Sequence, residues 1–132
     1  MNKRFLVWCA LVLGLAPRAE AEPRPLASMS CRVEAGSGRL LCTVSFTAPA
    51  ERTIAWSDAL VVAAPGAAKP LRNRVTSRSD HPDQVVLAFV IGSGEGGRIA
   101  VLARAVTCPK SPRSGSCTPL ESRIGYDFKP AG

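Results

Sequence analysis

Two cysteines near the C-terminal end of the chain, Cys108 and Cys117, are the residues with the clearest potential chemistry. Eight residues lie between them, and this segment is rich in Pro, Ser and Gly. Such a segment turns easily, so the two sulfurs can come within bonding range. A pair of this kind is either a structural disulfide or a redox centre that exchanges electrons with partner thiols. The residues leave both interpretations open.

A second pair, Cys31 and Cys42, is predicted to form a structural disulfide inside a hairpin. The segments before and after Gly36-Ser37 alternate apolar and polar side chains, which is typical of strands with one buried face. A two-residue type II′ turn at Gly36-Ser37 would make residues whose numbers sum to 73 face each other. Cys31 then lies opposite Cys42 on the core face, where a disulfide contributes about 2 to 4 kcal/mol.

Three arginines, Arg72, Arg74 and Arg78, could bind an anionic partner. Arg72 and Arg74 fall on one face of an expected strand over 71–77, and Arg78 continues the basic row. The same pattern is typical of an edge strand whose charges face solvent and discourage aggregation. The sequence therefore offers a possible anion-binding strip and an ordinary solvated edge.

Two other features do not support a site. His81, the one histidine, lies in a polar loop with too few neighbouring donors for a zinc ion, so we expect no metal. The glycine-rich run 92–97 lacks the Lys-Ser/Thr pair of a phosphate loop and leads into an expected strand rather than a helix. We expect an exposed loop histidine and a hairpin loop, and the sequence indicates no cofactor.

The segments that must position these residues are all predicted strands. No segment shows a sustained helical period, and turn residues recur about every ten positions. The pattern predicts one all-β domain over 22–132, an immunoglobulin-like antiparallel β-sandwich of about seven strands. Trp56 is expected in its core, and Ser57-Asp58 is expected to mark a bulge or kink. The expected elements are a hairpin over 28–47 and strands over 52–64, 71–77, 84–91, 98–107 and 120–128.

The first 21 residues have the pattern of a cleaved export signal. A short basic segment precedes an apolar run, and Ala19-Glu20-Ala21 matches an A-x-A cleavage site. Cleavage would leave 14 Lys and Arg against 9 Asp and Glu, a net charge of +5. Four cysteines would remain, an even number that suits an oxidising compartment. We expect a periplasmic or secreted protein with no stable membrane insertion.

The C-terminal half resembles a known family. The apolar strand QVVLAFVI, a glycine-containing turn, the strand RIAVLARAVT, Cys108, a loop, and then Gly-Ser-Cys117-Thr-Pro follow one another. This order is similar to that of the amino-terminal periplasmic domain of the thiol:disulfide interchange protein DsbD, an immunoglobulin-like module. The GRLLCTVSF and IAWSDALVV segments are similar in placement. The loop between the two cysteines is longer here than in the family, SRSDHPD is no clear counterpart of the family's cap loop, and Cys31 with Cys42 is an additional pair.

The resemblance implies a role for each loop cysteine. It would make Cys117 the thiol that attacks partner sulfurs and Cys108 its resolving partner. The partners would be thiol-disulfide relay proteins of the periplasm. Because this chemistry requires a thiolate, Lys110 and Arg113 in the loop are candidates to stabilise one.

The sequence therefore leaves two alternative functions. The first is thiol-disulfide exchange through Cys108 and Cys117. The second is a non-catalytic, disulfide-stapled binding or accessory module that recognises an acidic partner. Hydrolysis is disfavoured because no nucleophile elbow or recognisable pair of catalytic carboxylates is present. Nucleic-acid binding is disfavoured because few aromatic residues lie among the basic ones.

Overall fold

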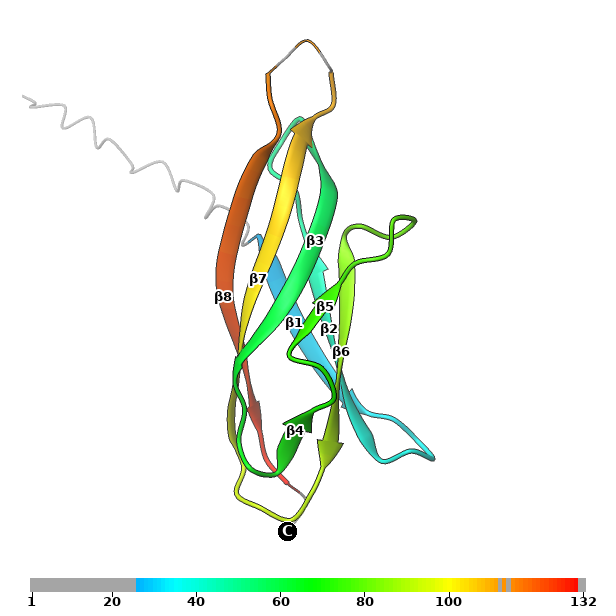
Figure 1. Ribbon diagram of the computed structural model, residues 1–132, viewed down its shortest axis with the longest axis vertical. Helices are drawn as coiled ribbons and strands as arrows, with labels where there is room; N and C mark the ends of the chain where they lie inside the picture. Colours follow the sequence, from blue (N-terminus) through cyan, green and yellow to red (C-terminus); the bar gives the residue numbers. More distant parts are fainter. Residues whose placement is uncertain (1–25, 112, 114, 131–132) are drawn as a thin grey trace, which may run out of the picture.

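The computed structural model describes residues 26–111, 113 and 115–130, and these residues form eight β-strands and no helix. Figure 1 shows them as an elongated sandwich whose strands run roughly along its long axis. The strands are β1 (Ala27–Val33), β2 (Arg39–Phe46), β3 (Arg52–Ala63), β4 (Ala68–Pro70), β5 (Arg74–Thr76), β6 (Gln84–Ile91), β7 (Gly97–Pro109) and β8 (Thr118–Phe128).

The strands form two antiparallel sheets of four. One sheet has the order β1-β2-β6-β4 and the other β5-β3-β7-β8. The long strands therefore follow the A-B-E and C-F-G arrangement of immunoglobulin-like sandwiches, with two short edge strands between β3 and β6. The predicted all-β sandwich is confirmed. The strand added to the expected seven is β4, whose three residues are too few to produce an alternating pattern.

The β1–β2 hairpin has the predicted register with a different turn. Cys31 pairs with Cys42 and Val33 with Leu40, so partner numbers sum to 73. The Glu34 N–H donates to the Arg39 carbonyl at 2.8 Å, so the turn closed by this pair has four residues, 35–38, rather than two. The Gly38 N–H donates back to the Glu34 carbonyl, and Gly36 and Gly38 both have positive φ, which glycine adopts at little cost. Widening the loop by one residue on each side leaves the register unchanged.

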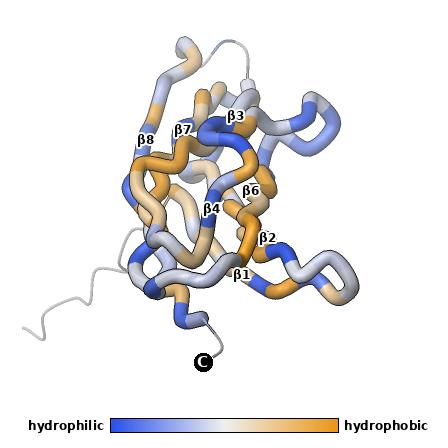
Figure 2. The backbone as a smooth tube through the Cα atoms, turned by 60° about the horizontal axis from the view of Figure 1, so that its bottom comes forward, coloured by the Kyte–Doolittle hydropathy of each residue, from blue (hydrophilic) through white to orange (hydrophobic). Residues whose placement is uncertain are grey.

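The core lies between the two sheets and is filled by every second residue of the long strands. Leu87 and Phe89 of β6 and Ile99 and Val101 of β7 are at most 1% exposed. In Figure 2 the hydrophobic colours concentrate along the strands, while the β1–β2 loop stands clear of the sandwich. As expected from its continuous apolar run, β6 is an inner strand of its sheet, between β2 and β4.

The bulge predicted at Ser57-Asp58 lies slightly earlier in β3, and it changes the position of Trp56. The register between β3 and β7 shifts between Ile54 and Trp56, which places Trp56 opposite Val106. An extra residue reverses the alternation of the strand. Ile54 packs against the core, whereas Trp56 is partly exposed on the outer face and lines a groove there. The prediction that Trp56 fills the core is therefore wrong.

Each disulfide joins neighbouring strands of a single sheet. Cys31 and Cys42 link β1 to β2, and Cys108 and Cys117 link the end of β7 to the start of β8. The β1–β2 and β7–β8 loops lie at opposite ends of the long axis (Figure 1). Antibody domains differ, because their conserved disulfide connects the two sheets.

The expected export signal, residues 1–21, lies outside the described residues. In the described part of the chain, no helix is long and apolar enough to cross a membrane.

Candidate functional site

The Cys108–Cys117 disulfide lies at the loop end of the β7–β8 hairpin, where β7 ends and β8 begins. Partner numbers in this hairpin sum to 225, from Gly97 with Phe128 to Thr107 with Thr118, and the two cysteines continue this register by one step. Their Cα atoms are 4.1 Å apart. Cys117 is exposed and Cys108 is partly exposed. The bridge is therefore open to solvent on the side of β8, an edge strand.

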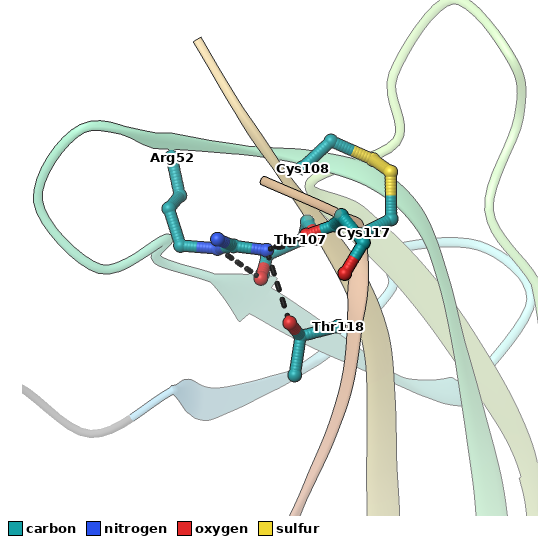
Figure 3. The surroundings of a disulfide bond; sticks show 6 residues. Arg52, Thr107, Cys108, Cys117 and Thr118 are labelled. Atoms are coloured by element: carbon teal, nitrogen blue, oxygen red, sulfur yellow. Dashed lines mark hydrogen bonds between the residues drawn. A yellow bond between two sulfur atoms is a disulfide. The ribbon is translucent and has the colours of Figure 1, made fainter. Parts of the chain in front are cut away.

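Arg52 fastens the two strands just below this disulfide (Figure 3). Its Nε donates to the Thr107 hydroxyl at 2.9 Å, and its Nη2 lies 2.7 Å from the Thr107 carbonyl oxygen. The same Nη2 lies 3.0 Å from the Ser116 carbonyl oxygen and 3.2 Å from the Thr118 hydroxyl. One guanidinium thus binds groups of β7, the loop and β8. The planar fork of arginine suits this role, since it offers several donors in fixed directions.

The turn between β2 and β3 brings Arg52 to this position. Glu51 has a φ of 62°, in the left-handed region that non-glycine residues rarely adopt. Its carbonyl accepts a hydrogen bond from the Lys110 N–H at 3.0 Å, which ties the start of the cysteine loop to this turn. The Lys110 and Arg113 residues that we expected to favour a thiolate are both exposed in the same loop.

The other disulfide has a different environment. Cys42 is 0% exposed and belongs to the core, while Cys31 is partly buried and packs against it. β2, which carries Cys42, is covered by a strand on each side. Because attack on a disulfide requires access to a sulfur atom, this bridge is protected and Cys108–Cys117 is the accessible one.

A second cluster lies on the outer face of the β5-β3-β7-β8 sheet, around Asp58. Its carboxylate is 0% exposed and accepts hydrogen bonds from the Nε of Arg74 at 2.8 Å and the Nε of Arg104 at 2.8 Å. The Nη2 of Arg104 also donates to Asp58 Oδ2 at 2.5 Å, so Arg104 binds the carboxylate in a bidentate manner. Glu121 lies opposite Arg104 on β8. Asp58 therefore holds two guanidinium groups in fixed positions on an otherwise open face.

The Asp58 carboxylate raises the pKa of Arg104 above the usual arginine value, mainly through its hydrogen bond. Burial acts in the opposite direction, and the charges of Asp58 and Glu121 add to the increase. Arg104 therefore keeps its positive charge at neutral pH and well above it.

An open groove of about 580 Å³ lies beside this cluster. Trp56 and Val106 are cross-strand partners, as are Val106 and Pro119, so these three residues form one apolar row across the sheet. The residues lining the groove are Trp56, Arg74, Arg104, Ala105, Val106, Pro119, Leu120 and Glu121. Val106 and Pro119 lie two positions along their strands from Cys108 and Cys117, on the same side of the sheet. The groove is thus next to the accessible disulfide.

The three arginines of the expected basic strip have different surroundings. Arg74 is bound to Asp58, and Arg78 makes a two-pronged contact with exposed Asp80 at 3.1 Å. Arg72 precedes β5 and lines a separate hollow with Leu71. β5 is an edge strand, as expected for this segment. His81 is exposed in the loop after Arg78, and in the described part of the chain no three His, Cys, Asp or Glu side chains are grouped to hold a metal ion.

The sequence interpretation did not find the Trp56, Asp58, Arg104 and Glu121 cluster. Asp58 and Arg104 are 46 residues apart, and the pattern of β7 gave no reason to single out one arginine among its outward residues. One signal was present: an aspartate directly inside an otherwise apolar strand segment needs a buried partner, because an unpaired buried charge is costly.

No family model, curated protein or solved structure matches this chain. The likeness to the amino-terminal domain of DsbD stays a prediction.

Proposed function

We propose that this protein is an exported thiol-disulfide exchange module, periplasmic or secreted, whose working pair is Cys108 and Cys117. The observation that carries the proposal is the difference between the two bridges. Cys117 is exposed at the tip of an edge hairpin, whereas Cys42 is completely buried. A partner thiolate can therefore approach the first bridge more readily than the second.

The exchange reaction moves two electrons and balances without a cofactor. In the reduced protein, the Cys117 thiolate attacks one sulfur of a partner disulfide, which forms a mixed disulfide and releases a partner thiolate. The Cys108 thiolate then attacks the Cys117 sulfur, closes the Cys108–Cys117 bond and releases the second partner thiolate. The partner is reduced to a dithiol, and this protein is oxidised.

Cationic groups near the pair support this chemistry. Lys110 and Arg113 belong to the loop between the cysteines, and Arg52 binds the backbone on both sides of the bridge. Positive charge near a cysteine lowers its pKa and favours the thiolate. The same Arg52 contacts keep the strand ends together, so the two sulfurs would remain neighbours after reduction.

The test is a redox titration of the folded protein in glutathione or dithiothreitol buffers, with alkylation and mass mapping of each cysteine pair. We expect Cys108–Cys117 to open at a potential well above about −300 mV, where structural bridges are usually found, while Cys31–Cys42 stays closed. If both bridges open only together with unfolding, the exchange proposal is lost.

The second candidate is a disulfide-stapled binding module without redox activity. The observation in its favour is that the Arg52 hydrogen bonds and the Cys108–Cys117 disulfide hold the same end of the β7–β8 hairpin together. Such an arrangement is typical of a rigid scaffold. In this case the acidic partner expected from the net positive charge would bind the outer surface, and neither bridge would be reduced in the folded state.

A further inference from the structure

We propose that the groove around Trp56 is a recognition site for an acidic peptide segment, in which an apolar side chain lies on Trp56 and a neighbouring carboxylate binds Arg74. This site is assigned from contacts that do not involve the sulfurs, so it stands under either candidate function. A partner segment bound here would also lie beside Cys108 and Cys117.

The apolar part of the site is the row formed by Trp56, Val106 and Pro119. Because the bulge in β3 turns Trp56 outward, an indole ring is available on a sheet face where a regular strand would have buried it. Pro119 has no N–H and lies on edge strand β8, so it adds apolar surface without removing an inner hydrogen bond of the sheet. Aromatic side chains contribute large contact areas at recognition sites.

The charged part of the site is held ready for a ligand by Asp58. The Arg74 side chain is 55% exposed, and among the described residues its one hydrogen bond is from Nε to Asp58. Its two Nη groups have no hydrogen bond among the described residues and can donate to a ligand. Since Asp58 is 0% exposed and also binds Arg104, the guanidinium groups are positioned before a ligand arrives.

The charges also decide the orientation of the ligand. Glu121 lies opposite Arg104, so a ligand carboxylate is repelled at the β8 side and attracted at the β5 side, where Arg74 is located. Backbone N–H groups of a peptide could instead donate to Glu121. The net charge of +5 that remains without the expected export signal favours the approach of an acidic segment. A volume of about 580 Å³ holds a few side chains, and the open shape suits a chain laid across the sheet.

The experiment uses the full chain with Trp8→Phe, in which Trp56 is the sole tryptophan, because the sequence contains two. The probe is the capped tetrapeptide acetyl-Gly-Asp-Phe-Gly-amide, with Asn in place of Asp or Ala in place of Phe as matched controls. We expect a saturable change in Trp56 fluorescence with the first peptide and at least about tenfold weaker binding of each control, as for a lost charged hydrogen bond or a lost aromatic contact.

Protein variants then locate the site. Arg74→Gln is expected to lower the affinity for the Asp-Phe peptide by about tenfold. Arg78→Gln is the matched control and should leave this affinity unchanged, because its partner Asp80 lies outside the groove. Circular dichroism checks that both variants are folded. Equal affinity for the Asp and Asn peptides, an unsaturable signal, or equal binding by Arg74→Gln overturns the proposal.

Two further measurements distinguish the peptide groove from the redox pair and from a membrane-binding surface. In Cys108→Ser/Cys117→Ser, exchange is abolished while peptide binding is retained, so failure of one proposal leaves the other testable. Vesicles containing anionic lipid are the second probe. If they change Trp56 fluorescence and the peptide does not, the surface is a membrane site and the peptide proposal is wrong.

Discussion

Cys42 lies directly opposite Cys31 across the β1–β2 ladder, with its side chain completely buried and the two Cα atoms 4.0 Å apart. Cys108 and Cys117 have the same cross-strand relationship at the other end of the molecule, but they are open to solvent. The two bridges close loops of similar length, with sequence separations of 11 and 9. Loop entropy alone therefore gives them nearly equal stabilising effects, about 3 kcal/mol each.

The first prediction is that removal of the buried bridge costs more stability. Cys31→Ala/Cys42→Ala loses the loop-closure contribution of the disulfide and also leaves a cavity in the core. We therefore expect the free energy of unfolding to fall by about 4 kcal/mol. Cys108→Ala/Cys117→Ala should lose about 3 kcal/mol or less, because little core packing is removed. Urea unfolding followed by circular dichroism measures both. Equal losses would show that the burial of Cys42 contributes nothing.

The second prediction concerns the Arg52 fork. Arg52→Lys keeps the charge but cannot bind Thr107 and Ser116 together, so it should lower the free energy of unfolding by about 1 to 2 kcal/mol. The same change at exposed Arg39, at the opposite end of the molecule, should alter stability by less than about 0.5 kcal/mol. Thermal unfolding of the two variants side by side is the measurement, and similar midpoints would contradict the structural role of the fork.

The third prediction concerns Asp58. Asp58→Asn removes the negative charge that two partly exposed arginines share, and we expect it to cost about 2 kcal/mol of stability, as for a lost hydrogen bond to a charged group. Asp80→Asn, which removes an exposed pair with Arg78, should cost less than about 0.5 kcal/mol. Denaturant titration compares them.

The pH dependence of this cost follows from the pKa of Arg104, which is raised in the folded state. A raised pKa adds stability that is present below the ordinary arginine pKa and is lost only when the pH rises through the pKa of the folded state. The difference between the natural protein and Asp58→Asn should therefore be the same at about pH 6 and pH 9. A difference that disappears at pH 9 would contradict the charged pair.

The fourth prediction concerns the glycine-rich loop before β7. A Cβ atom at Gly96 would lie 2.5 Å from the Phe128 carbonyl oxygen and from Pro130, so Gly96→Ala must move backbone and should cost about 1 to 3 kcal/mol. Gly92→Ala meets nothing within 4 Å and should have little effect. Calorimetry of both variants tests whether this loop is packed against the C-terminal strand. Equal melting temperatures would show that it is not.

Local patterns in the sequence predicted the sandwich and one hairpin register correctly. Alternation located the long strands, and the symmetric placement of cysteines around Gly36-Ser37 gave the pairing of Cys31 with Cys42, even though the turn itself has two more residues. Register depends on the sum of partner positions, so an error that is equal on both sides of a turn cancels.

Trp56 and Asp58 could not be placed in the same way. A one-residue bulge between Ile54 and Trp56 reverses the side chains of β3 that follow it, up to a second register shift between Val61 and Ala63. Nothing in the segment distinguishes the first bulge from one two residues further on. The partners of Asp58 come from β5 and β7, which the chain reaches only after long connections. The outer-face groove therefore results from strand order, whereas the cysteine loop could be recognised from spacing alone.

Because both bridges lie within a sheet, no covalent bond joins one sheet to the other through the core. The two sheets are held together by apolar packing and by the connecting loops. When the sandwich opens, each half keeps one closed hairpin with its partners already in register. During oxidative folding, each cysteine finds its partner within its own hairpin, so the correct pairing can be complete before the sheets meet. A non-native bond would have to connect residues of different sheets across a much longer span of chain.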